Sequence, residues 1–257
     1  MSLVWSQFFY GVEITSENNL VDFTEASVAK QATLAIGAYS FTDLATELAR
    51  ALNAAGDYDY TVTTNRTNRT FTVATEGSET FELLAVTGVG VGATGLPTCG
   101  FTADKTGANT YTGSAVGTLY RPQFALQSYV SSEDLRRAAD ATVNKSASGR
   151  VEIFSFGLEK FVEFNIRYAT DIPQPADHPI ENSATAIADL RAFMRHLTSK
   201  FPVEFMPDRD APNTFETLIL EKTPEDSKGV GYRLRELYGE SLPGYFETGV
   251  LQLRVIE

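Results

Sequence analysis

Between residues 40 and 56 the apolar positions repeat with the period of an α-helix. Ser40 is a good N-cap residue, and Asp43 places a negative charge in the first turn, where the helix dipole stabilises it. Gly56 then provides a stop signal. The apolar residues that share one helical face are Phe41, Leu44, Leu48, Ala51 and Leu52. We therefore predict one amphipathic helix in this segment.

After this helix the period changes to two, which is typical of half-buried strands. Residues 58–63 and 70–73 alternate apolar and polar side chains around a polar segment at 65–68, and this order predicts a β-hairpin. A third strand is predicted over residues 81–86, followed by a glycine-rich loop and a short turn around residues 96–101. One helix on a small antiparallel sheet is the simplest arrangement of these elements.

The C-terminal half is rich in strand patterns and contains one strong helix pattern. The apolar stripe of this helix is Ile187, Leu190, Met194 and Leu197, with Asn182 or Ser183 as the cap. Strands are predicted over residues 151–158, 162–168, 203–206, 215–221 and 250–255, and a second, shorter helix over 232–238. There is no strand–helix–strand alternation of the kind that builds a parallel sheet.

Composition changes twice along the chain and predicts the domain boundaries. Residues 30–118 are rich in Thr, Ala and Gly and carry a net charge of −3, which leaves −9 on the flanks. We therefore expect an N-terminal strand segment at 1–29 that belongs to the body, an inserted small α+β module at 30–118, and a β-rich body at 119–257 with its helix at 183–199. The fold class predicted is α+β, mainly β, with a β-sandwich or split-barrel body and one long helix.

Charge and cysteine content exclude several kinds of chemistry. The chain has 21 basic and 33 acidic residues, a formal charge of −12, which argues against a grip on nucleic acid or on an anionic membrane. A single cysteine, Cys99, rules out an internal disulfide framework and a multi-cysteine zinc site. No signal-peptide pattern and no apolar run of bilayer length is present, so we expect synthesis in a cytoplasm and no membrane insertion.

Two short motifs have an ordinary structural explanation. Gly90, Gly92 and Gly95 match the spacing of a dinucleotide-binding loop, but Pro97 follows at once and no adequate helix can begin there, so a flexible loop is favoured. The glycosylation-type motifs that start at Asn65 and Asn68 lie in the predicted hairpin turn and indicate turn chemistry.

Oxygen ligands gather in one proline-flanked segment. Asp208, Asp210, Asn213 and Glu216 are the residue types that calcium prefers, but their spacing does not match an EF-hand, and an ordinary charged turn is favoured.

Neither histidine comes with a catalytic motif. His178 lies in a proline-rich loop, and His196 is about 180° from the apolar stripe of its helix, so a surface position is expected for both. Cys99 is expected to be a small packed side chain rather than a nucleophile. We predict no enzyme, no catalytic residue, no cofactor and no metal.

Two stretches resemble structural proteins of tailed bacteriophages. The first is the inserted module, with Tyr39-Ser40-Phe41-Thr42-Asp43 at its helix and Cys99-Gly100-Phe101-Thr102 near its end. The second runs from Tyr120 to Glu257. It includes Ser148-Gly149-Arg150-Val151-Glu152 and the aromatic-x-Pro-Asp segment Phe205-Met206-Pro207-Asp208, and it looks like the distal tail and tail-tip (baseplate) proteins of long-tailed phages.

This resemblance implies a virion structural protein, made late and assembled into a ring that joins the tail tube to the tail tip. The family expectation is a homo-hexamer, with the tail tube protein and the tail-tip hub proteins as further partners. Ring contacts are expected at the loop of residues 172–180, at the turn of residues 208–213, and at sheet edges near 162–168 and 250–255. The interface residues we predict are Pro173, Pro175, His178, Asp208, Arg209, Asp210 and Asn213.

Three alternatives stay open from the sequence. A receptor- or carbohydrate-binding tail module is suggested by the 11 tyrosines and by Trp5, because exposed aromatic rings stack on sugars. A tail terminator or neck protein is the nearest alternative within the structural class. A hydrolase that uses His178 or His196 is the third.

Overall fold

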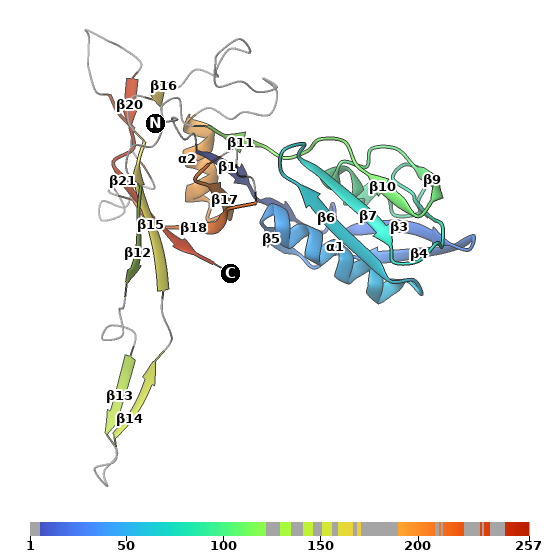
Figure 1. The fold of residues 1–257 in the computed structure, drawn as a ribbon, viewed down its shortest axis with the longest axis horizontal. Coiled ribbons are helices and arrows are strands. Elements are labelled where there is room, and N and C mark those ends of the chain that lie inside the picture. Colours follow the sequence, from blue (N-terminus) through green and yellow to red (C-terminus); the bar gives the residue numbers. More distant parts are fainter. Residues whose placement is uncertain are drawn as a thin grey trace.

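The computed structural model describes residues 6–121, 129–134, 141–145, 151–155, 159–166, 169–170, 190–208, 211, 213–223, 232, 234–236 and 245–256. They form two units that lie side by side (Figure 1). We call residues 12–118 the small unit and the remaining described residues the body. Each unit has a hydrophobic core of its own.

The body is built on a seven-stranded antiparallel sheet in the order β11-β1-β17-β18-β21-β15-β12. Its strands are β1 (Gln7–Tyr10), β11 (Leu119–Tyr120), β12 (Tyr129–Asp134), β15 (Glu159–Asn165), β17 (Val203–Met206), β18 (Glu216–Lys222) and β21 (Val250–Val255). Helix α2 (Leu190–Thr198) packs on this sheet, with Phe193, Met194 and Leu197 fully buried. A further three-stranded sheet contains β16 (Ala169–Thr170), β20 (Tyr245–Glu247) and β19 (Arg235–Glu236).

A hairpin arm extends from the ends of β12 and β15 along the strand direction (Figure 1). Strands β12 and β15 pair as far as Asp134 and Glu159, and beyond them β13 (Ala141–Lys145) pairs with β14 (Val151–Ser155). Figure 1 shows this pair projecting away from the body.

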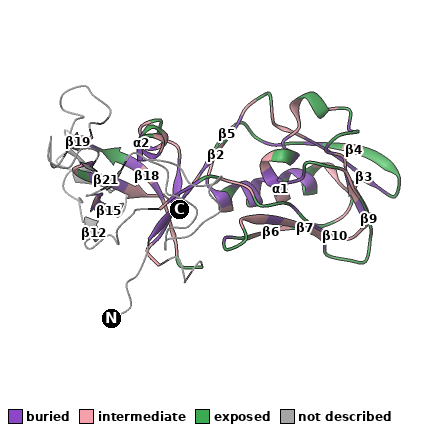
Figure 2. Ribbon diagram, turned by 90° about the horizontal axis from the view of Figure 1, so that it is seen from above, coloured by how far each residue is buried: buried purple, intermediate pink, exposed green. Residues whose placement is uncertain are grey.

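The small unit places α1 (Phe41–Ala55) between two sheets (Figure 2). One sheet contains β10 (Thr110–Thr112), β7 (Thr70–Thr75) and β6 (Tyr60–Asn65). The other contains β4 (Val28–Thr33), β3 (Leu20–Glu25), β8 (Phe81–Leu83) and β9 (Lys105–Ala108), while β2 (Val12–Ile14) pairs with β5 (Gly37–Tyr39). Two short 3-10 turns, Val91–Ala93 and Leu96–Cys99, lie in the long connection after β8.

The helix of the small unit begins and ends where its sequence pattern indicates. Ser40 is the N-cap and accepts a hydrogen bond from the Asp43 amide at 3.1 Å, and Gly56 is the C-cap. The predicted apolar face is buried in the core of the small unit. A helix with one apolar stripe gains most of its stability from covering a sheet in this way.

The predicted class, α+β and mainly β, is confirmed. The hairpin of the small unit, the strand at 203–206 and the strand at 250–255 are also confirmed, and Leu190, Met194 and Leu197 are buried on α2 as expected. The predicted start of this helix, residues 182–189, lies outside the described residues.

Three sequence predictions about organisation need correction. The N-terminal segment was expected to belong to the body as far as residue 29, but only β1 does: β2 pairs with β5, and β3 pairs with β4 and β8, so residues 12–29 belong to the small unit. The small unit contains three sheets, whereas one small sheet was predicted. Within the predicted helix at 232–238, Arg235–Glu236 is strand β19. In each case a strand distant in the sequence determines the pairing, and local composition carries no information about that partner.

Candidate interaction surfaces

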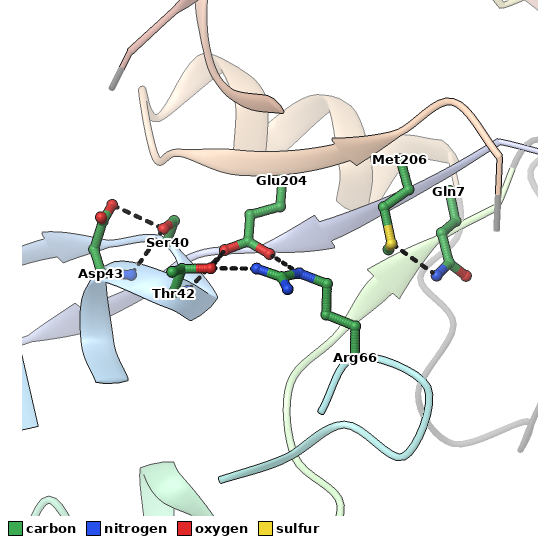
Figure 3. A network of polar contacts seen from close by, with 7 residues as sticks. All are labelled: Gln7, Ser40, Thr42, Asp43, Arg66, Glu204 and Met206. Carbon is green, nitrogen blue, oxygen red and sulfur yellow. Dashed lines mark hydrogen bonds and ion pairs between the residues drawn. The ribbon is translucent and has the colours of Figure 1, made fainter. Parts of the chain in front are cut away.

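A buried carboxylate joins the two units. All four residues of β17 are buried, and Glu204 has no exposed surface. Its Oε1 accepts hydrogen bonds from the Thr42 amide at 2.7 Å and from the Thr42 hydroxyl at 2.6 Å, and its Oε2 accepts from Arg66 Nε at 2.9 Å (Figure 3). Glu204 belongs to the body, whereas Thr42 and Arg66 belong to the small unit.

The first turn of α1 is well suited to receive this carboxylate. The first amides of a helix have no partner within the helix, and the helix dipole makes this end positive. Ser40 satisfies the Asp43 amide from within the small unit. Glu204 satisfies the Thr42 amide from the body.

Arg66 completes the contact from the turn between β6 and β7. It is only 9% exposed, donates through Nη2 to the Thr42 hydroxyl, and lies with Cζ 3.5 Å from the centroid of the Phe215 ring. Asn65 holds the same turn by accepting from the Asn68 amide at 2.9 Å, which is the turn chemistry expected there. The sequence analysis missed the role of Arg66, because nothing local distinguishes it from an exposed turn residue.

Two glycines lie where the chain passes between the units. The Gly11 amide donates to the carbonyl of Pro202 at 2.8 Å, and a Cβ atom at Gly11 would lie 2.5 Å from the carbonyl oxygen of Tyr39. No larger residue fits there without movement of the backbone. Gly117, at the second passage, has φ of +84°, a conformation that favours glycine.

The predicted interface residues fall into two groups. Pro173, Pro175, His178, Arg209 and Asp210 lie outside the described residues. Asp208 and Asn213 are in the turn between β17 and β18. There the Ala211 amide donates to the Asp208 carbonyl at 3.0 Å, and Asn213 is exposed. This turn leads directly into Phe215, so it lies beside the contact between the units.

His196 was expected on the surface, but the structure shows that it is partly buried. Its ring stacks on Tyr10 with centroids 4.1 Å apart, lies 5.4 Å from Phe201, and has Nε2 3.4 Å from the Pro202 carbonyl. Burial lowers the pKa of His196 below 6.5. The 100° step of the helix places His196 opposite the apolar stripe of α2, but the rings of Tyr10 and Phe201 cover that side of the helix.

The glycine-rich loop is held by carboxylates of the small unit itself. The Gly90 amide donates to Asp22 Oδ2 at 2.6 Å, and the Val86 amide donates to Asp104 Oδ1 at 2.7 Å. A short 3-10 turn that begins at Leu96 follows, with Pro97 in its first turn. The Gly90 amide already has a carboxylate partner, and only a short 3-10 turn follows the motif, so the loop explanation of the glycine motif is supported.

Cys99 is packed in the core of the small unit. It is 1% exposed, and burial raises the pKa of its thiol to about 12, so the thiolate that nucleophilic chemistry needs is disfavoured. Within the described part of the chain, no three acidic, histidine or cysteine side chains gather in a way that would hold a metal ion.

In the part of the chain that the structure describes, the seven-stranded sheet ends at β11 on one side and at β12 on the other. Among the described residues β12 pairs only with β15, so one side of its backbone faces away from the sheet. The strands β15 and β21, near which sheet edges were expected, are themselves interior, and β12 is the edge next to β15.

No known protein family matches this sequence, and no curated protein matches it. No helix in the described ranges has both the length and the apolar character that crossing a bilayer requires.

Proposed function

We propose that the protein is a structural subunit of a phage tail tip or baseplate, and that it forms the distal tail ring between the tail tube and the tip. The single observation that carries the proposal is the open seven-stranded sheet, whose edge strand β12 continues with β15 into the arm β13–β14 (Figure 1). The sequence resemblance to tail-tip proteins supplies the biological context.

Among the described residues, one side of β12 has no strand partner, and such an edge suits assembly. Such an edge either is covered or pairs with another chain, because exposed amides and carbonyls gain hydrogen bonds by adding a strand. A ring needs two different surfaces on each subunit that fit one another. We assign β12 and its arm to one of these surfaces, with a hexamer as the expected assembly and the tail tube and hub proteins above and below it.

Three of the 11 tyrosines are buried, which counts against their use in sugar binding. Tyr60, Tyr111 and Tyr120 are 3%, 7% and 3% exposed, so their faces are used inside the two units rather than offered to a sugar. Trp5 lies outside the described residues. His196, the described histidine of the hydrolase alternative, has mainly aromatic neighbours. A tail terminator or neck protein needs the same kind of ring and stays the alternative within this class.

The test removes the arm without disturbing the sheet. Asp134 and Glu159 are directly paired, so an Asn-Gly turn that replaces residues 135–158 closes the same hairpin. We expect the parent protein to form a closed ring by light scattering and negative-stain imaging, and the shortened protein to remain folded but monomeric. Rings of normal size from the shortened protein would rule out the arm as a ring contact. A parent protein that stays monomeric at high concentration, alone and with tail tube protein, would contradict the proposed function.

A further inference from the structure

We propose that Glu204 is a latch that fixes the orientation of the small unit on the body, and that Gly11 and Gly117 form the hinge about which the small unit turns when the latch is open. This inference concerns the single subunit and does not depend on the ring.

The chain geometry supplies a hinge with one axis. The small unit is one continuous segment, so the chain enters and leaves it once each. The two passages are adjacent, because the Tyr10 amide donates to the Thr118 carbonyl at 2.9 Å. A glycine lies next to each of them, at Gly11 and Gly117. Hinges are a few residues at the ends of elements that absorb changes in φ and ψ, and two adjacent glycine passages meet that description.

The apolar part of the contact between the units gives little directional constraint. Phe9 and Phe41 lie with ring centroids 5.6 Å apart, and Phe9 also belongs to a small cluster with Leu119 and Met206. Contacts of this kind depend on buried area and tolerate sliding. We therefore expect them to hold the units together over a range of hinge angles.

The polar part, in contrast, permits one arrangement. Both oxygens of Glu204 are engaged, and their partners come from two separate elements of the small unit, α1 and the turn after β6. The side chains of Arg66 and Glu204 are 7% and 0% exposed, so a small rotation would break the pair and its hydrogen bonds before water could replace them. A buried ion pair adds little net stability compared with apolar residues of the same size, but its geometry is specific. This is the property that a latch requires.

The chain offers a matched control for the latch. Glu216 forms an ion pair with Lys160, and both residues belong to the body. Glu204→Gln and Glu216→Gln therefore make the same chemical change, one across the contact between the units and one beside it.

The experiment measures the distance distribution between the units in the full chain. Nitroxide labels on Glu76→Cys in the small unit and Lys222→Cys in the body are read by pulsed electron resonance. Both positions are exposed, and buried Cys99 stays unlabelled. We expect Glu204→Gln to broaden the distribution about twofold, because the small unit then samples a range of hinge angles, and Glu216→Gln to leave it unchanged. A folded Glu204→Gln protein with the parent distribution would overturn the proposal.

A second variant covers the case in which Glu204→Gln does not fold. Glu204→Leu combined with Arg66→Met removes both charges, so no buried charge is left unpaired. We expect this protein to fold, to keep a melting temperature close to that of the parent, and to show the broadened distribution. The parent distribution in this double variant would overturn the latch. So would loss of the fold in both variants, because Glu204 would then support the fold itself and not the orientation.

Discussion

Glu25 shows how a single buried acid organises one end of the small unit. Its carboxylate accepts from the Asp57 amide at 2.8 Å, the Tyr60 hydroxyl at 2.9 Å, the Lys30 ammonium at 3.0 Å and the Tyr58 amide at 3.3 Å. Burial by itself raises the pKa of this carboxyl, but the four donors outweigh burial and the pKa is lowered below 4.5. Glu25 therefore ties the segment after α1 to strand β3.

Replacing Glu25 with glutamine tests this role. The amide removes the charge that Lys30 binds and turns one acceptor oxygen into a donor that faces other donors. We expect the free energy of unfolding to fall by about 1–3 kcal/mol, measured by urea denaturation at neutral pH. Glu76→Gln is the control, because Glu76 is exposed, and it should change the stability little.

The same variant predicts a pH dependence. Because the folded pKa of Glu25 lies below the ordinary value of 4.5, its stabilising contribution is complete above that pH and is lost as the pH falls through the folded value. The difference in unfolding free energy between the parent and Glu25→Gln should therefore shrink on acidification below pH 4.5. A difference that stayed constant down to strongly acidic pH would show that the charge of Glu25 contributes nothing.

At the scale of elements, α1 depends on a cap that is local in sequence. Ser40 is fully buried, accepts from the Asp43 amide at 3.1 Å, and donates its hydroxyl hydrogen to Asp43 Oδ2 at 2.7 Å. Asp43 also places a negative charge near the positive end of the helix dipole. The cap fixes the start of α1, and with it the position of the Thr42 amide that Glu204 binds.

Ser40→Ala should lower the free energy of unfolding by about 1 kcal/mol, because the Asp43 amide loses its acceptor inside the protein. Chemical denaturation measures the change. Thr46→Ala, at an exposed position inside the same helix, should be neutral or slightly stabilising, since alanine is the better helix former. Equal effects of the two substitutions would show that the cap is not a separate contribution.

Elements also show where sequence patterns stop being informative. The helix at 41–55 and the hairpin at 60–75 were predicted because their periodicity and caps lie within a few residues. The contact of Arg66 with Glu204 joins residues 138 positions apart, and no local pattern marks either of them. Composition, which placed the start of the inserted module at residue 30, reports average polarity and not strand pairing.

At the scale of the whole molecule, the small unit has what an independent domain needs. Its core includes Phe23, Phe71, Phe81 and Phe101, each at most 1% exposed. Its two ends meet at adjacent chain passages. Excision exposes Thr42 and Arg66 to water, which can satisfy both of them.

We therefore expect residues 12–118 alone to fold and to unfold in a single cooperative thermal transition, followed by circular dichroism. Phe23→Ala in the same fragment should abolish the transition, because removing a fully buried phenylalanine costs about 3–5 kcal/mol. A fragment without a cooperative transition would mean that the body is required to complete this core.

Capping and hydrophobic period act over a few residues, so the class of the fold, the helix that begins after Ser40 and the hairpin that follows can be predicted from the sequence. Three features come from tertiary contacts: β3 belongs to the small unit, β12 is the last described strand on one side of its sheet, and Glu204 is buried against α1. The reason is physical. Strand pairing and the burial of a charge are settled by partners far away in the chain, and the free energy that selects them belongs to the assembled core rather than to any segment.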